Sequence, residues 1–450
     1  MDVDKSMTDD PFLLPIFEQA DPETAVLGVI GLGYVGLPLA VAFASHGRRV
    51  IGYDLDARRV ARIRSGMDDT GEVSPADLQR ALARGLMPTA DPDRLSEARI
   101  IMVCVPTPIT SDRRPDLGPL LAACAILGPR LHAGSVVVFE STVYPGVTED
   151  ICGPALAAAS GLVLGRDVML GYSPERINPG DRAHRIDTIV KVVSGQGRAL
   201  TEALGRLYGL LNGGLIHVAP SIRAAEAAKA IENAQRDINI AFVNEVALIC
   251  ERIGLSVHDV LDIARTKWNF LDFKPGLVGG HCIGVDPYYL SHLSQMIGHE
   301  PEVILAGRRI NDHMADEMAD RIAFRFREVV QPILRPRVLI LGATFKEDVP
   351  DLRNSRIPQL VHRLSRHGFD VKVHDPWFAP QELASRQDVE AIGWPEETFD
   401  LVVMAVGHRD FLDRSPEVIF RLVSPGGMMA DPKGFYRTAQ RDPSVNYWSL

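Results

Sequence analysis

The segment GLVGGHCIGVDPYY, from Gly276 to Tyr289, places a thiol, an imidazole and a carboxylate in a glycine-rich stretch. Cys282 follows glycines that permit close approach of a substrate, and His281 and Asp286 lie near it in sequence. A thiol reacts as a nucleophile when it is accessible and its pKa is lowered. Because a neighbouring negative charge raises a thiol pKa, Asp286 does not activate Cys282. We expect Asp286 to hold a water molecule or a cationic partner.

The other four cysteines are interpreted as small buried side chains in apolar strands or helices: Cys104, Cys124, Cys152 and Cys250. Five scattered cysteines with no CxxC pair support neither a disulfide framework nor a zinc site. We therefore predict no metal.

A cationic partner for Asp286 is available on a predicted helix from Ser221 to Ile253, which contains neither Pro nor Gly. Lys229, Asn233 and Arg236 follow one another at i, i+4 and i+7, so they share one face of this helix. Such a face can hold an oxyanion and a phosphate. The alternative is a solvated face with a Glu232–Arg236 ion pair, and the spacing alone favours that alternative.

A second chemical pattern is GLGYVG, in which Gly31, Gly33 and Gly36 match GxGxxG. It follows a predicted strand and opens a predicted helix, and Asp54 ends the next strand about 20 residues later. This arrangement indicates a dinucleotide site, and the charge of Asp54 favours NAD over NADP. Arg58 and Arg59 follow closely, so the residues alone leave NADP as an alternative. A tight strand–helix turn without a ligand is the other alternative.

Three further polar residues come directly after predicted strands: Thr107 in VPTP, Thr142 in ESTVYPG and Glu175 in GYSPERINPGD. Loops at strand ends carry the chemistry of open α/β sheets. Each residue is also a common turn former or lies beside one, so a purely structural role is the alternative.

These residues must be positioned by alternating strands and helices. Apolar runs at 48–54, 99–106, 134–142 and 167–175 alternate with helical stretches, and the same pattern returns from Arg337 onward. The predicted fold is α/β, with two Rossmann-like, doubly wound parallel-sheet domains joined by a long central helix. The predicted organisation is a tail (1–24), a dinucleotide domain (25–220), a central helical domain with the thiol segment (221–325) and a second Rossmann-like domain (326–450).

The composition limits the possible partners. The chain has 450 residues, 46% hydrophobic and 24% charged, with a formal net charge of -10. This acidity disfavours a general role on nucleic acid or on an anionic membrane. With no secretory signal and no apolar run of about 18 residues, the chain is predicted to be soluble and cytoplasmic.

Taken together, the motifs resemble those of the UDP-glucose/GDP-mannose dehydrogenase family. Within it, the chain is most similar to UDP-N-acetylhexosamine 6-dehydrogenases of surface-polysaccharide synthesis, of the Vi-antigen type. The resemblance runs from about Ala25 to about Trp377 and rests on GLGYVGLPLAVAF, VPTP, ESTVYPG, GYSPERINPGD, EAAKAIEN, QRDINIAFVNE, TKWNF, PGLVGGHCIGVDPYYL, LAGRRIND and PDLRNSR.

The resemblance implies oxidation of C6 of a UDP-N-acetylhexosamine from alcohol to carboxylate, with two NAD used in turn. Cys282 would form a thiohemiacetal and then a thioester. Lys229, assisted by Asn233, would stabilise the alkoxide. Asp286 would hold Lys229 or the hydrolytic water, and Glu175 would be a general base or position water near Thr142.

The resemblance also implies ligand contacts, homodimers and a role in capsule or O-antigen synthesis. The substrate contacts would be Arg176, Ile177, Lys229, Asn233, Arg236, Lys274, Gly279, Phe345, Lys346 and Arg353. The NAD contacts would be Gly31, Gly33, Tyr34, Val35, Gly36, Asp54, Arg59, Thr107 and Thr142. Two alternatives remain: a two-electron dehydrogenase of the β-hydroxyacid type, and a non-catalytic nucleotide-sugar sensor.

Overall fold

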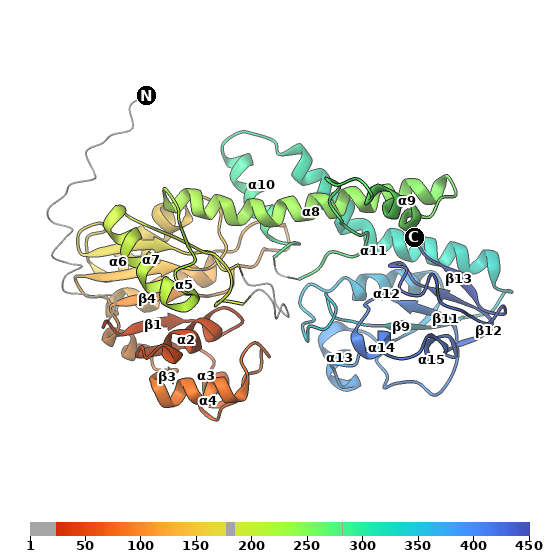
Figure 1. Cartoon of the computed structure of the whole chain (residues 1–450), viewed down its shortest axis with the longest axis horizontal. Helices are drawn as coiled ribbons and strands as arrows, with labels where there is room; N and C mark the ends of the chain where they lie inside the picture. The colour runs from red at the N-terminus through yellow and green to blue at the C-terminus, as the bar shows by residue number, and fades with distance from the viewer. Residues whose placement is uncertain (1–23, 177–184, 281) are drawn as a thin grey trace. The chain divides into compact units, whose positions relative to one another are not determined.

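The computed structural model describes residues 24–176, 185–280 and 282–450 (Figure 1). The chain divides into two compact units: the first extends to Glu232 and includes Tyr288–Gly298, and the second contains Asn233–Pro287 and His299–Leu450. The division falls within the long helix α8 (Ile222–Arg252). This confirms the helix predicted from Ser221 to Ile253, and the Ser221 hydroxyl accepts a bond from the backbone N–H of Ala224 at its start. The predicted domain boundaries stay predictions.

The first unit contains a sheet of eight strands in the order β3-β2-β1-β4-β5-β6-β7-β8. Neighbouring strands are parallel except for β6 and β7. This confirms the predicted doubly wound parallel sheet. The strands are β1 (Leu27–Ile30), β2 (Val50–Tyr53), β3 (Leu86–Thr89), β4 (Ile100–Val103), β5 (Ser135–Phe139), β6 (Val168–Tyr172), β7 (Lys191–Gly195) and β8 (Ile216–Val218).

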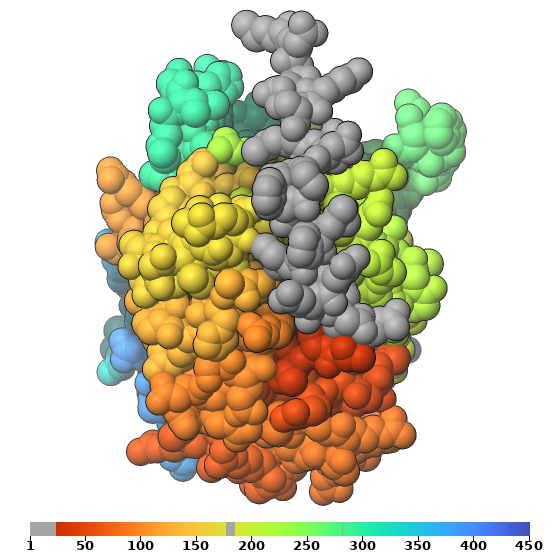
Figure 2. All heavy atoms as spheres, turned by 90° about the vertical axis from the view of Figure 1, so that its left-hand side faces the viewer, coloured from red at the N-terminus to blue at the C-terminus, as the bar shows by residue number. Residues whose placement is uncertain are grey.

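The central strands of this sheet are buried on both faces. Every residue of β1, β2, β4, β5 and β6 is buried, which explains why their sequences are continuous apolar runs. Apolar residues of α2, α4 and α7 form one core with alternate residues of these strands. Figure 2 shows one face of this unit. The red to yellow-green atoms there belong to the first half of the chain. The helices are α2 (Gly36–Ser45), α3 (Ala57–Arg64), α4 (Pro75–Arg84), α5 (Gly118–Leu127), α6 (Gly153–Ser160) and α7 (Arg198–Asn212).

The second unit contains a five-stranded parallel sheet in the order β10-β9-β11-β12-β13. Its core joins this sheet to α8, α9, α11 and α12, and α11 packs along α12 (Figure 1). The strands are β9 (Arg337–Leu341), β10 (Asp370–His374), β11 (Phe399–Met404), β12 (Val423–Ala430) and β13 (Asn446–Trp448). The helices are α9 (Val257–Ala264), α11 (Glu302–Val329), α12 (Ile357–Arg366), α13 (Pro380–Gln387), α14 (Arg409–Leu412) and α15 (Pro416–Phe420).

Helix α10 (Asp286–Met296) begins in the second unit and continues in the first. Within the described residues, none of the helices combines the length and the apolar character needed to cross a bilayer.

Candidate active site

In the glycine turn after β1, each of the three positions is occupied by glycine for a different structural reason. Gly31 has φ +89°, and a Cβ there would lie 2.8 Å from the carbonyl oxygen of Cys104. A Cβ on Gly36 would lie 1.9 Å from the carbonyl oxygen of Gly31, so the helix packs directly on the turn. Around Gly33, no described atom lies within 4 Å of the Cβ position. The turn therefore leaves open space at the start of α2, which suits a pyrophosphate.

Asp54 is fixed at the tip of this turn. One carboxylate oxygen accepts a bond from the backbone N–H of Leu32 at 2.8 Å, and the other accepts from that of Asp56 at 2.9 Å. Arg59 donates to the carbonyl oxygen of Leu32 at 3.3 Å. Tyr34, in the same turn, is half-buried, as Asp54 is. Asp54, Arg59 and Tyr34 thus lie at the glycine turn, and their role in holding NAD stays a prediction.

The second unit repeats the plan but uses its carboxylate differently. Gly342 directly follows β9 and has φ +92°, and Asp375 follows β10 in the position that Asp54 has after β2. Asp375 is 2% exposed and accepts bonds from the backbone N–H of Ala343 at 2.7 Å and of Trp377 at 2.9 Å, and His408 lies 3.1 Å away. Burial alone would raise the pKa of Asp375, but His408 and the N–H bonds outweigh it and lower that pKa. Because the Asp375 carboxylate is already bonded to two backbone N–H groups and His408, it does not offer a site for a ribose.

The three predicted residues at strand ends share one edge of the first sheet. Thr107, Thr142 and Glu175 follow the neighbouring parallel strands β4, β5 and β6. The carbonyl oxygen of Thr107 accepts a bond from the Tyr289 hydroxyl at 3.0 Å. The Ser141 hydroxyl, beside Thr142, reaches back to the loop after β4. The strand order therefore places these three residues at the same edge of the sheet, and their roles stay predictions.

The predicted polar face of α8 is buried at two of its three residues. Lys229 and Asn233 are 8% and 4% exposed, whereas Arg236 is exposed. Glu232 pairs with Arg176 at 2.6 Å, and Arg236 instead donates to Asn233 at 3.4 Å. The alternative interpretation with a Glu232–Arg236 pair is therefore wrong. It failed because spacing along a helix does not show which face a neighbouring segment covers.

The thiol segment is tied to α8 through Asp286. The backbone N–H of Asp286 donates to the carbonyl oxygen of Cys282 at 2.8 Å, and Cys282 is half-buried. The carboxylate of Asp286, 2% exposed, accepts a bond from the Asn233 amide at 2.5 Å. The predicted contact of Asp286 with Lys229 stays a prediction. His281 lies outside the described residues.

Two side chains that the sequence did not single out hold the start of this segment. The buried amide of Asn244 donates to the carbonyl oxygen of Gly276 at 3.0 Å and accepts from its N–H at 2.8 Å. Arg356 donates to the carbonyl oxygen of Val278 at 3.0 Å. Both belong to helices or loops far from the segment in sequence. No local spacing predicts such contacts.

Gly279, Gly280 and Phe345 also meet in the second unit. A Cβ on Gly279 would lie 2.9 Å from that of Phe345, and one on Gly280 would lie 2.7 Å from its ring. Asn354 donates to the carbonyl oxygen of Gly280 at 3.2 Å. The glycines are therefore required by close packing of the thiol segment, and Gly279 and Phe345 are neighbours, as predicted substrate contacts should be.

The remaining predicted substrate residues differ in their partners and in how far they are buried. Arg353 pairs with Asp351 through Nε at 2.9 Å and Nη2 at 2.8 Å. A phosphate at Arg353 would thus lie beside an existing carboxylate. Lys346 is half-buried and Lys274 is exposed. Ile177 lies outside the described residues.

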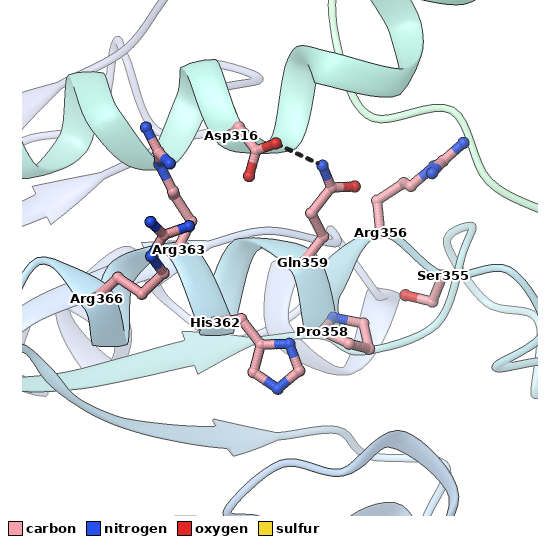
Figure 3. Close-up of a pocket in the computed structure, with 8 residues that line it drawn as sticks. All are labelled: Asp316, Ser355, Arg356, Pro358, Gln359, His362, Arg363 and Arg366. Carbon is pink, nitrogen blue, oxygen red and sulfur yellow. Dashed lines mark hydrogen bonds between the residues drawn. The ribbon is translucent and has the colours of Figure 1, made fainter.

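A hollow of about 370 Å³ lies between α11 and α12 in the second unit (Figure 3). Gln359 donates to Asp316 there at 2.8 Å, as the dashed line in Figure 3 shows. The lining residues Arg356 and Arg363 pair with Asp312 and Asp320 of α11. Because these guanidinium groups already face carboxylates, the hollow is not assigned to the substrate.

The cysteines other than Cys282 follow the prediction with one exception. Cys124, Cys152 and Cys250 are buried, whereas Cys104 is only half-buried at the end of β4, beside the glycine turn. Cys104 was expected to be buried, and it is more open because the strand ends there. Among the described residues, no group of three or more His, Cys, Asp or Glu side chains is arranged to hold a metal ion.

Comparison with known proteins adds independent information. The UDP-glucose/GDP-mannose dehydrogenase family matches the chain in three parts: its NAD binding domain at residues 25–212, its central domain at 223–313 and its UDP binding domain at 339–438. The chain is 44% identical over 408 residues to UDP-N-acetyl-D-glucosamine 6-dehydrogenase of Pseudomonas aeruginosa, covering 90% of this chain and 96% of that protein. It is 43% identical to protein CapL of Staphylococcus aureus, covering 94% and 99%.

A solved structure with a similar fold is the UDP-D-ManNAc dehydrogenase of Pyrococcus horikoshii. It superposes with a TM-score of 0.82 at 28% identity, covering 94% of this chain and 98% of that one. The family match spans most of the chain, and relatives above 40% identity match nearly end to end. The chain belongs to the UDP-glucose/GDP-mannose dehydrogenase family.

Proposed function

We propose that the chain is an NAD-dependent UDP-N-acetylhexosamine 6-dehydrogenase that converts the C6 alcohol into a carboxylate in two oxidations. The observation that carries the proposal is the link from Cys282 through Asp286 to Asn233, which ties a thiol segment to the buried polar face of α8. Two relatives that are 44% identical carry the name UDP-N-acetyl-D-glucosamine 6-dehydrogenase, which supports the same activity.

The proposed cofactor is NAD, which accepts a hydride in each oxidation when bound. The open space at Gly33 fits its pyrophosphate, and Asp54 fits a ribose hydroxyl pair. Tyr34, Val35 and Arg59 complete this group, and Thr107 and Thr142 lie at the same sheet edge.

The chain's own residues then divide the work. Lys229, assisted by Asn233, would stabilise the alkoxide left when the C6 hydroxyl gives its proton to solvent, and this alkoxide becomes the aldehyde carbonyl once the hydride has been transferred. The Cys282 thiol adds to the resulting aldehyde, so the reactive carbonyl is held covalently until the second hydride leaves. Water then cleaves the thioester. Glu175 takes a proton from that water, and Asp286 positions it.

Substrate recognition is proposed mainly for residues of the second unit. Phe345, Lys346, Arg353 and Gly279 of the second unit would contact the UDP-sugar, together with Arg236 and Lys274. Arg176 is proposed as a further contact. We also propose a homodimer and a place in capsule or O-antigen synthesis, which the similarity to protein CapL supports.

The test is the yield of NADH per sugar with purified chain, NAD and a panel of UDP-N-acetylglucosamine, UDP-N-acetylgalactosamine, UDP-N-acetylmannosamine and UDP-glucose. Two NADH and a product heavier by one oxygen and lighter by two hydrogens support the proposal. One NADH indicates a two-electron dehydrogenase, and binding without turnover indicates a sensor. Either of those outcomes would overturn it.

A further inference from the structure

A buried charged cluster lies at the edge of the first sheet. Its members Lys191, Glu140 and Tyr208 are not among the predicted site residues. The side chains of Lys191 and Glu140 are 3% and 0% exposed and pair at 2.7 Å. The Tyr208 hydroxyl donates to the other oxygen of Glu140 at 2.5 Å. Taking an ion pair out of water costs about as much as the attraction between its members returns. Stability alone therefore does not explain why this pair is present.

The cluster reaches Glu175 because β7 runs antiparallel to β6. Tyr172 pairs with Ser194, and continuing that register by three residues places Lys191 opposite Glu175. The Lys191 ammonium lies 3.8 Å from the Glu175 carboxylate, and it donates to the carbonyl oxygen of Pro174 at 3.3 Å. A parallel β7 would bring its last residue, rather than its first, to this edge.

The charges around Glu175 alternate in sign. The titratable groups of this cluster are Cys104 from the end of β4, Glu140 from the end of β5, Lys191 from β7 and Tyr208 from α7. The backbone N–H of Arg176 donates to the Glu175 carboxylate at 2.6 Å. Burial alone would lower the pKa of Lys191, but Glu140 and Glu175 together raise it, so Lys191 stays cationic.

We propose that Lys191, held in place by Glu140 and Tyr208, is a positioning residue that orients the Glu175 carboxylate for its role as a base. The inference rests on the proposed function. In that step, Glu175 takes a proton from water, the water oxygen bonds to the thioester carbon, and the bond to the Cys282 sulfur breaks with the electron pair leaving on the thiolate.

Two variants should slow thioester hydrolysis and leave the earlier steps unchanged. Lys191→Met removes the cation 3.8 Å from the Glu175 carboxylate, so hydrolysis should slow at least about tenfold. Glu140→Gln removes the carboxylate that holds Lys191, so hydrolysis should slow by a smaller factor. A general loss of packing would also weaken NAD binding and slow thioester formation. Arg198→Met, at an exposed Arg198–Glu202 pair of the same unit, is the control and should change none of these steps.

The experiment is a single-turnover reaction of the full chain with NAD and UDP-N-acetylglucosamine, quenched in acid at intervals, in which mass spectrometry follows thioester formation and thioester hydrolysis separately. NAD affinity is measured in parallel by isothermal titration. Slower hydrolysis with unchanged thioester formation and unchanged NAD affinity supports the inference. Unchanged hydrolysis in both variants, or an equal loss at every step, overturns it. If Lys191→Met does not fold, the hydrolysis rate of Glu140→Gln decides. A wild-type chain that forms no acid contradicts the proposed function instead.

Discussion

At the scale of single residues, Asp54 and Asp375 each follow the corresponding strand of two similarly arranged sheets, but they have different partners. Asp375 is buried against His408. Asp54 is half-buried and accepts bonds from two backbone N–H groups, that of Leu32 in the glycine turn and that of Asp56. The carboxylate of Asp54 retains acceptor capacity for a ligand, and that of Asp375 has been used within the fold. The difference assigns the cofactor to the first unit.

Asp54→Ala should therefore weaken NAD binding. Losing charge-assisted hydrogen bonds costs roughly 1.5–3 kcal/mol, which corresponds to about 10- to 100-fold in the dissociation constant. Isothermal titration with NAD, and separately with UDP, measures the effect. Affinity for UDP should remain within about twofold, because Asp54 belongs to the other unit.

Lys346→Ala provides the reciprocal control. It should weaken binding of the UDP-sugar and leave NAD affinity unchanged. If each substitution weakened both ligands equally, the assignment of NAD to the first unit and UDP to the second would be wrong.

At the scale of elements, α8 acts as a scaffold from which buried amides hold the thiol segment. Asn233 bonds Asp286, and Asn244, three turns further along, clamps both backbone groups of Gly276. Asn244 also donates to Asn311 of α11 at 2.9 Å. Helix and segment are thus joined at both ends of the segment. These contacts hold the segment that carries Cys282.

Asn244→Ala should destabilise the second unit. The substitution leaves the N–H and carbonyl groups of Gly276 buried without a partner, and each such loss costs about 1–3 kcal/mol. We expect the free energy of unfolding, measured by urea denaturation, to fall by roughly 2–5 kcal/mol. Asn239→Ala on the same helix removes only a local bond to Gln235 and should change it by less than about 0.5 kcal/mol. Equal effects would show that the clamp is unimportant.

How far the sequence predicts these elements depends on what their residues contact. Central strands and α8 were predicted because burial on both faces, or a long run without Pro and Gly, leaves a local pattern. The strand β3 contains Pro88, which is tolerated because β3 lies at the sheet edge. The short strand β8 is half-buried to exposed and has no apolar run, so it leaves no local pattern from which it could be predicted.

The candidate site shows the same limit. The glycine turn and the thiol segment are local motifs and were identified from sequence. The Lys191–Glu140 pair spans 51 residues and the Asn233–Asp286 bond spans 53, so no spacing predicts them. A charged residue at the end of an apolar run is the only sequence signal that Glu140 and Lys191 offer. Such residues are rarely buried unless they are paired.

At the scale of the whole molecule, the proposed homodimer has a candidate surface on α8. Phe242 and Ile249 of α8, and Ile253 directly after its last residue, are 58%, 51% and 64% exposed. Steps of seven and four residues place all three on one side of the helix. Exposed apolar stripes of this kind mark interaction surfaces more often than isolated apolar residues do. We infer that this stripe contributes to the contact between two copies of the chain.

Phe242→Asp should raise the dissociation constant of the dimer at least about tenfold, because a buried aromatic anchor would be replaced by a charge. Light scattering coupled to size-exclusion chromatography over a dilution series measures it. Val163→Asp, which replaces a side chain 46% exposed elsewhere on the surface, is the matched control and should leave assembly unchanged. A wild-type chain that is monomeric at all concentrations would contradict the inference.

The most direct test of the central proposal is the mass of the intact chain during turnover, quenched in acid within milliseconds of mixing with NAD and UDP-N-acetylglucosamine. We predict a transient adduct of one UDP-sugar that maps to the peptide containing Cys282, that disappears as carboxylate forms, and that is missing in Cys282→Ala. Steady formation of the sugar acid with no adduct at any time, or undiminished acid formation by Cys282→Ala, would contradict covalent catalysis by this thiol.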